Sequence, residues 1–462
     1  MGFQGRTILV VSDYRPQEPH RLAYSWPAYG SYLESNLCRL PARDPPVMRP
    51  HDRGRALQKS QAPGSSARSL IVRHHARLAR LKTRGGRAMK DSLGSRSIRA
   101  LVLDDYEQEP YISTLTLREP GWGEVQVRIL SSGVCHSDLH AISATLPLPV
   151  PLVLGHEGSG LVMKTGPGVF SVSEGMPVVV TWVPACGRCP WCLEGQPELC
   201  EEARRGSMSG AGRAGSPLSR DGQEVYPFSW AGTLAEEVVV PEAAVVPLPV
   251  AMPWDEAALL GCAVQTGVGA AFRSPLRPGD SALVIGLGGV GLNIVQGARI
   301  MGATTIIGVD PFDGKRRVAS HLGATHVLDP ADTDILGAVL ELTDDRGVDV
   351  AFEAVGDAGL IALAFNAARR GGTAVAVGVP TPQAELSVNA FSFPSQGKTL
   401  TGSWLGGSYP ARDIPRLVRL WAARRLTLSP LISAPYPLDA APQALRDLAE
   451  GRVIRPVVHP QG

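Results

Sequence analysis

The chain has 462 residues, of which 44% are hydrophobic and 19% charged, with a net charge of +2. This is an ordinary globular composition with room for two or three domains. No apolar run approaches the roughly 20 residues that span a bilayer, so no membrane-spanning segment is predicted. Nor does the start of the chain, MGFQGRTILVVSDYRP, have an apolar core long enough for a secretory signal.

Residues 1–88 differ in character from the rest. They hold 16 Lys+Arg and 5 Asp+Glu, a net +11, whereas residues 89–462 hold 29 and 38, a net −9. The early segment is rich in Arg, Pro and Ser, and only residues 69–84 have the pattern of a basic helix. We interpret residues 1–96 as a basic disordered or non-native tail, and we therefore expect no nucleic-acid partner. The alternative is an arm that binds nucleic acid through its positive charge.

From residue 99 to about 260 the pattern is rich in β-strands, with short β-branched runs such as EVQVRILSSG and MPVVVTWV separated by Gly and Pro. From about 265 to 400 predicted strands and helices alternate. That alternation predicts a parallel sheet with right-handed crossovers. Residues 401–462 add two helices and a terminal strand, and the fold class is therefore α/β.

Four of the seven cysteines fall within CGRCPWCLEGQPELC, in the spacing C-x2-C-x2-C-x7-C. Four thiolates close all four positions of a structural zinc ion. An iron–sulfur cluster is the alternative, although bacterial ferredoxins have a shorter last gap. The members of this predicted zinc lobe, residues 184–202, are Cys186, Cys189, Cys192 and Cys200.

A second group of metal ligands is spread over three segments: GVCHSDLH contributes Cys135, GHEGSG contributes His156 and GCAVQTG contributes Cys262. Two thiolates and one imidazole leave the fourth tetrahedral position open, as a catalytic zinc requires. Each of these residues alone could have a purely structural role. The metal-site interpretation depends on the three occurring together in one chain.

The sequence GLGGVG follows a predicted strand and opens a predicted helix, as a dinucleotide fingerprint does. Its glycines permit a tight turn and close approach to a pyrophosphate at a helix N-terminus. Asp310 ends the next strand, where it is placed to bind an adenosine ribose, and its charge favours NAD over NADP, although Lys315 lies nearby. The fingerprint residues are Gly286, Gly288, Gly289, Val290 and Gly291.

GHEGSG, CHSDLH, the four-cysteine lobe and GLGGVG, in a chain of this pattern, resemble the zinc-containing medium-chain alcohol dehydrogenases over residues 97–462. The resemblance implies a GroES-like β-rich catalytic domain (97–263), a Rossmann doubly wound parallel-sheet domain (264–402) and a return segment (403–462) that completes the catalytic domain. It also implies two zinc ions per chain, one catalytic and one structural, with NAD as the cofactor.

The resemblance assigns roles to the matching positions. The alcohol oxygen, polarised by the catalytic zinc, would ionise near neutral pH and hydride would pass to the nicotinamide. Ser137 and His140 would relay the proton, and Asp138 and Glu157 would act as carboxylates behind the metal ligands, with Asp138 orienting His156. The remaining cofactor-binding positions are Thr266, Val355, Val377, Val379 and Ser403 near the nicotinamide, and His136 and Arg455 near the pyrophosphate.

Two other functions remain open at this level. The stretch from GVPTPQ to ARDIPRLV is also similar to mycothiol-dependent formaldehyde dehydrogenases, which oxidise S-hydroxymethyl thiols. A non-catalytic zinc- and nucleotide-binding protein of the same fold is the alternative from another class. We expect a primary or secondary alcohol as substrate and an aldehyde or ketone as product, a cytoplasmic location, and a homo-oligomer (a dimer or tetramer) by analogy with the family.

Overall fold

The computed structural model describes residues 94–210 and 215–462. Residues 1–93 of the predicted tail, with the predicted helix at 69–84 and Cys38, lie outside the described residues, and Arg96 at its end already begins β1. No helix in the described ranges is long and apolar enough to cross a membrane.

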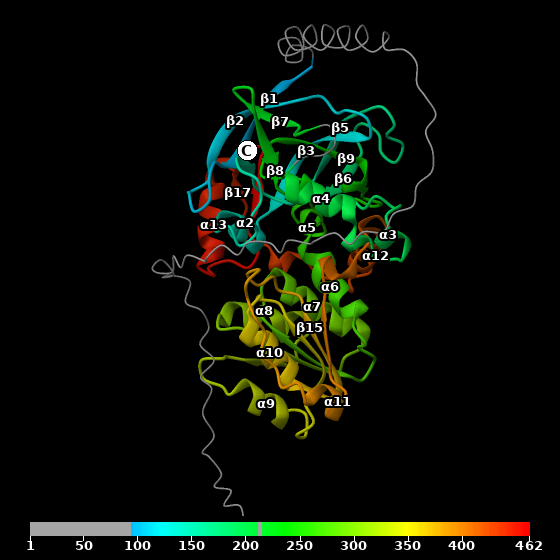
Figure 1. Ribbon diagram of the computed structural model, residues 1–462, viewed down its shortest axis with the longest axis vertical. Helices are drawn as coiled ribbons and strands as arrows, with labels where there is room; N and C mark the ends of the chain where they lie inside the picture. Colours follow the sequence, from blue (N-terminus) through cyan, green and yellow to red (C-terminus); the bar gives the residue numbers. More distant parts are fainter. Residues whose placement is uncertain (1–93, 211–214) are drawn as a thin grey trace, which may run out of the picture. The chain divides into compact units, whose positions relative to one another are not determined.

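The β-rich part forms two sheets (Figure 1). A closed barrel has the order β1-β2-β7-β8-β4, with bounds Arg96–Leu103, Tyr111–Leu117, Leu218–Arg220, Gln223–Pro227 and Leu152–Val153. The second sheet has the order β10-β6-β5-β3-β18-β17, with β9 paired to β3; the bounds are Val245–Pro247, Pro177–Val180, Glu157–Thr165, Glu124–Gly133, Val457–His459, Tyr436–Pro437 and, for β9, Glu237–Pro241. Strands β17 and β18 come from the end of the chain, so the return segment is built into this sheet.

The third sheet is parallel throughout, in the order β13-β12-β11-β14-β15-β16. Numbered along the chain, this order is 3-2-1-4-5-6, the doubly wound arrangement of dinucleotide-binding domains, so the predicted fold class is confirmed. The strand bounds, from β11 to β16, are Ser281–Ile285, Thr305–Val309, His326–Leu328, Val348–Glu353, Ala368–Ala376 and Thr399–Gly402.

Helices α7, α8 and α10 pack against the strands of this sheet (Figure 1). Their bounds are Gly289–Met301, Asp313–Leu322 and Ala358–Ala367, and α9 spans Ile335–Glu341. The sequence predicts a helix over residues 358–372, but α10 ends at Ala367. Ala368 already pairs with Val348, and a register shift then absorbs the following residues before Thr373 pairs with Val350.

The remaining helices lie between or beside the sheets. They are α2 (His136–Ile142), α3 (Pro190–Leu193), α4 (Glu201–Ser209), α5 (Trp254–Leu259), α6 (Ala263–Arg273), α11 (Ser392–Gln396), α12 (Pro410–Ala422) and α13 (Ala441–Ala449), with short 3-10 turns that include η2 (Phe228–Trp230) and η4 (Leu405–Gly407).

Close packing of α6 on α7 brings the two halves of the site together. A β-carbon added at Gly267 would lie 2.3 Å from the Val290 carbonyl oxygen, and one at Gly297 would lie 2.7 Å from the Ala271 side chain. Only small residues at these positions allow the two helix backbones to approach so closely. Helix α6 begins directly after Cys262 and α7 begins within the glycine turn, so this contact places a predicted metal ligand beside the predicted dinucleotide fingerprint.

Candidate functional site

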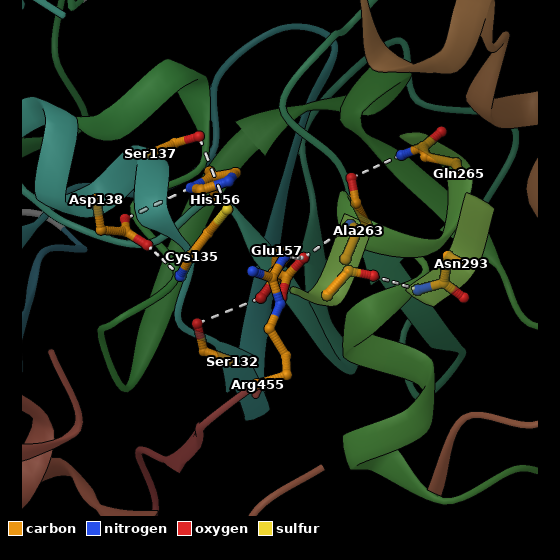
Figure 2. A network of polar contacts seen from close by, with 12 residues as sticks. Ser132, Cys135, Ser137, Asp138, His156, Glu157, Ala263, Gln265, Asn293 and Arg455 are labelled. Atoms are coloured by element: carbon orange, nitrogen blue, oxygen red, sulfur yellow. Dashed lines mark hydrogen bonds and ion pairs between the residues drawn. The ribbon is translucent and has the colours of Figure 1, made fainter. Parts of the chain in front are cut away.

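The structure brings together the three metal ligands predicted from separate segments. One ligand atom each from Cys135, His156 and Cys262 lies within 4.8 Å of the other two, and all three residues are buried. Figure 2 shows Cys135 and His156 beside Asp138. Cys135 caps α2, His156 directly precedes β5, and Cys262 caps α6. Nε2 of His156 is buried without a hydrogen-bond partner, so this nitrogen is available to a metal. We call these residues the three-donor site.

Asp138 holds two of the three segments in place. Its carboxylate accepts hydrogen bonds from the backbone N–H groups of Cys135 and Gly155, both at 2.9 Å, and Oδ1 lies 3.4 Å from Nδ1 of His156. The side chain is completely buried. The position fits the orienting role predicted for Asp138.

A buried ion pair underlies the site. Arg455 Nη2 lies 2.7 Å from Glu157 Oε2, and the side chains are 3% and 0% exposed. The same oxygen accepts the Ala263 N–H at 3.1 Å, whereas Glu157 Oε1 has no hydrogen-bond partner. Removing one member of such a pair leaves an uncompensated buried charge, which costs roughly 3–5 kcal/mol.

The electrostatics of the three-donor site favour a cation. Burial opposes a charged imidazole, but Asp138 and Cys135 outweigh it and raise the pKa of His156 to about 10. The contact between the two thiols lowers the pKa of Cys135 well below its usual value and raises that of Cys262 well above it. A divalent ion would allow both thiols to ionise, so the residues fit a zinc ion with an open fourth position.

The predicted proton-relay residues both lie on α2. The Ser137 hydroxyl is 3.7 Å from the Cys135 sulfur. Nδ1 of His140 is buried without a hydrogen-bond partner, and burial lowers the pKa of this histidine. Within the described ranges no hydrogen bond joins Ser137 to His140, so their relay stays a prediction.

The four cysteines of the lobe also converge. Their sulfurs lie within 4.8 Å of one another, and all four are free thiols. Backbone N–H groups surround two of the sulfurs: Cys186 and Ala203 donate to Cys200 at 3.3 and 3.5 Å, and Cys189 donates to Cys186 at 3.4 Å. Four thiols with such donors fit a closed structural zinc site.

The glycine turn lies beside cationic side chains. A β-carbon at Gly289 would be 3.4 Å from Arg455 Cδ, so this arginine lies over the turn. Burial, together with the positive charges of Lys315 and Arg455, lowers the pKa of His136 to about 4. These groups from three parts of the chain are close enough to act on one another, and together with the turn they fit a pyrophosphate.

Asp310 is buried at the end of β12. Its Oδ2 accepts the Leu287 N–H at 2.8 Å and its Oδ1 the Phe312 N–H at 2.9 Å. The carboxylate therefore fastens the glycine turn to the strand end. Lys315 lies with its ammonium 4.4 Å from the centre of the Phe312 ring.

The positions predicted to face the nicotinamide have free polar groups. The Thr266 and Ser403 hydroxyls are both buried without hydrogen-bond partners. Val355 lies against the turn, since a β-carbon at Gly286 would be 2.6 Å from its Cγ2. Val377 is 7% exposed, and Val379 places its backbone against Gly356.

Sequence reasoning missed Glu353, which ends β14. Its Oε1 accepts the N–H groups of Val355 and Gly356 at 2.7 Å, whereas Oε2 is buried without a partner. Burial raises its pKa to about 7 against these hydrogen bonds. The only sequence signal is a carboxylate ending an apolar strand just before AVG.

Three aromatic residues around His156 were also missed. The Phe228 ring centre is 4.9 Å and the Trp182 ring centre 6.3 Å from that of His156, both edge to face. Trp404 packs edge to face on Trp182 at 5.4 Å. The only sequence signals were indirect: Trp182 lies four residues before Cys186, and Trp404 directly follows Ser403.

Comparisons with known proteins agree with this geometry. Residues 121–250 match the family model described as alcohol dehydrogenase GroES-like domain, and residues 289–423 match the model described as zinc-binding dehydrogenase. The chain is 35% identical over 365 residues to the NDMA-dependent alcohol dehydrogenase of Amycolatopsis methanolica, covering 78% of this chain and 98% of that one.

Two solved structures extend the comparison. Benzyl alcohol dehydrogenase from Acinetobacter calcoaceticus superposes with a TM-score of 0.75 at 31% identity, covering 79% of this chain and 99% of that one. A zinc-binding dehydrogenase from Sinorhizobium meliloti, solved bound to NADP, has a TM-score of 0.67 at 26% identity, covering 79% and 100%.

The fold and site therefore define a zinc-dependent alcohol oxidoreductase with a nicotinamide cofactor. The chain belongs to the zinc-containing medium-chain alcohol dehydrogenase family, as its sequence motifs predict. The relatives favour this function over the thiol-dependent and non-catalytic alternatives.

The glycine turn gives a first prediction. A β-carbon at Gly288 meets no atom within 4 Å, but it would stand where a pyrophosphate approaches. Gly288→Ala should leave the unfolding temperature unchanged and weaken NADH binding about 10-fold or more, measured by fluorescence titration. At Gly291 the β-carbon would lie 1.7 Å from the Gly286 carbonyl oxygen, so Gly291→Ala should lower both the unfolding temperature and the affinity for NADH. Full NADH affinity in Gly288→Ala would contradict this placement.

The buried carboxyl of Glu353 gives a second prediction. Because its pKa rises from 4.5 to about 7 on folding, the folded state holds this proton more tightly than the unfolded state. Its contribution to stability is complete below pH 4.5 and is lost as the pH rises through 7, a total of about 3 kcal/mol.

Glu353→Gln should therefore remove this part of the pH dependence. The free energies of unfolding of the wild type and the variant, measured from pH 5 to 8, should diverge in favour of the variant as the pH rises. The exposed Glu385→Gln is the matched control. Parallel curves for wild type and Glu353→Gln would refute the prediction.

Proposed function

We propose that this alcohol dehydrogenase uses NAD and two zinc ions per chain, and that it oxidises aromatic or bulky apolar alcohols to the aldehyde or ketone. The observation that carries the proposal is the three-donor site, buried beside a glycine turn and the Arg455 side chain. The same proposal divides the chain at about residues 97, 264 and 403, following the three sheets and the return strands.

The residues in and around the three-donor site have distinct proposed roles. Cys135, His156 and Cys262 would hold the catalytic zinc, which, when bound, polarises the alcohol oxygen and lowers its pKa. Asp138 orients His156, and Arg455 compensates the charge of Glu157. Ser137 lies beside Cys135 and would accept the alcohol proton. His140, with Nδ1 free, would pass it towards solvent.

The cofactor is positioned by the adjacent domain. The glycine turn with Arg455, His136 and Lys315 would bind the pyrophosphate and its flanking ribose. The Thr266 and Ser403 hydroxyls would bind the nicotinamide side, with Val355, Val377 and Val379 against the ring. The buried Asp310 carboxylate supports NAD, because its charge repels a 2′-phosphate, although the related Sinorhizobium structure holds NADP.

The aromatic residues support the substrate class. Trp182 and Phe228 present their rings to His156, and Trp404 continues the aromatic surface from Trp182. Such rings favour a partner ring in offset or edge-to-face contact. The related protein from Acinetobacter is named for benzyl alcohol, which agrees with this choice.

We also propose a cytoplasmic homo-oligomer. The six described cysteines form no disulfide, which suits a reducing compartment. Strand β16 is the last strand of its sheet and is largely exposed, with Phe391 73% exposed nearby. An uncovered strand edge favours pairing with a second copy. Sedimentation velocity should therefore give a mass of at least two chains; a 48.9 kDa monomer would contradict this.

Removal of one metal donor tests the chemistry. Cys135→Ala should lower kcat with an alcohol by about 1000-fold or more, because the site loses an anionic ligand. NADH binding should remain within a few-fold of the wild type, and NADPH should bind more weakly to both. Ser143→Ala, an exposed position at the end of α2, is the control. Normal turnover in Cys135→Ala would rule out the three-donor site as the catalytic centre.

The substrate class is tested at Trp404. Trp404→Ala should lower kcat/KM for benzyl alcohol about 10-fold or more while changing that for ethanol little, because only the larger substrate reaches the ring. Trp122→Ala, at an 81% exposed tryptophan in the turn before β3, should change neither. An equal loss for both alcohols would contradict aromatic selection.

A further inference from the structure

The turn that carries Phe228 has an unusual backbone. Ser229 and Trp230 are consecutive residues with φ angles of 45° and 70°. This left-handed region is unfavourable for any residue with a β-carbon. Such strain persists only where the surrounding contacts impose it, and it is found where a structure needs a fixed geometry.

One set of contacts comes from α4, the helix that leaves the four-cysteine lobe. Trp230 donates its indole N–H to the Ala203 carbonyl oxygen at 2.9 Å. Its ring lies directly on the helix backbone, since a β-carbon at Gly206 would be 1.6 Å from Trp230 Cζ2. Helix α4 is itself capped by Cys200, whose sulfur accepts the Ala203 N–H. The turn is thus fixed to a ligand of the lobe.

The other set of contacts leads to the catalytic centre. Directly after the turn, Thr233 and Leu234 donate backbone hydrogen bonds to Gly155 and Leu154, each at 3.0 Å. Those residues immediately precede His156. At the start of the turn, the Phe228 ring rests edge to face on the His156 ring. The turn therefore holds the histidine both through its backbone and through its ring.

We propose that Trp230 is a positioning residue through which the four-cysteine lobe fixes His156 and Phe228 for metal binding and substrate contact. If Trp230 leaves Gly206 and Ala203, the strained turn can relax, and Phe228 and the segment before His156 lose their support. The three-donor site would then hold its ion less tightly. The cofactor site should not change, because Arg455 and the glycine turn lie on other elements. The kinetic part of this inference rests on the proposed function.

The decisive variant is Gly206→Ala. A helix-interior Gly→Ala change raises helix propensity, but here the added β-carbon would also displace the Trp230 ring, so a purely structural role predicts a change in stability alone. The positioning role predicts in addition that kcat/KM for benzyl alcohol falls about 10-fold or more. It also predicts that a chelator removes zinc from the three-donor site several-fold faster. Zinc released by Cys135→Ala, which comes from the four-cysteine lobe alone, is subtracted from the total to isolate this site. NADH affinity should stay within about two-fold.

Two further variants define the contact. Trp230→Phe keeps a ring on Gly206 but loses the hydrogen bond to Ala203, so it should lie between the wild type and Trp230→Ala in both readouts. Arg205→Ala, an exposed neighbour on α4, should match the wild type. Unchanged zinc release and kcat/KM in both Gly206→Ala and Trp230→Ala would overturn the proposal. Absence of alcohol oxidation by the wild type would instead refute the proposed function, and the zinc-release comparison would still decide this inference.

Discussion

Two thiols and an imidazole, brought from three segments and buried together, are the constraint on which the rest of the structure depends. The contact between the thiols lowers the pKa of Cys135 and raises that of Cys262, while Asp138 and Cys135 raise the pKa of His156. Buried groups of this kind need compensating charge. A divalent ion held by these three donors would both supply that charge and act as the Lewis acid that alcohol oxidation requires, with its fourth position open to the substrate.

The fold places this site by backbone approach as much as by side-chain chemistry. Gly267 and Gly297 let α6 lie close to α7, so the ligand Cys262 and the dinucleotide turn share one packed contact. Arg455, from the return segment, reaches both Glu157 and Gly289. A single buried guanidinium thus connects the carboxylate behind the metal ligands with the place predicted for the cofactor's pyrophosphate.

Local sequence patterns predicted much of this. The four-cysteine spacing and the glycine turn are short-range motifs, because their ligands or N–H groups lie within fifteen residues or one turn of each other. The strand and helix alternation predicted the parallel sheet, although α10 ends at Ala367 and not at residue 372, because β15 begins pairing at Ala368. The three-donor site could be predicted only because the other motifs were present, since Cys135 and Cys262 are too far apart in the sequence to form a motif of fixed spacing.

What the sequence could not provide depends on contacts between distant residues. Phe228, Trp182 and Trp404 come from separate segments, and each is an ordinary apolar residue in its own surroundings. The pKa of the Glu353 carboxyl is raised only because the fold buries this side chain at the end of β14. The strain at Ser229 and Trp230 leaves no trace in residue type, since neither is a glycine.

The most direct test of two distinct metal sites is the zinc content of the purified protein, measured with and without the Cys262 thiol. The account predicts two zinc ions per chain in the wild type and one in Cys262→Ala, with the remaining ion lost only when Cys192 is also replaced. A wild-type chain that holds a single zinc, unaffected by Cys262→Ala, would contradict it.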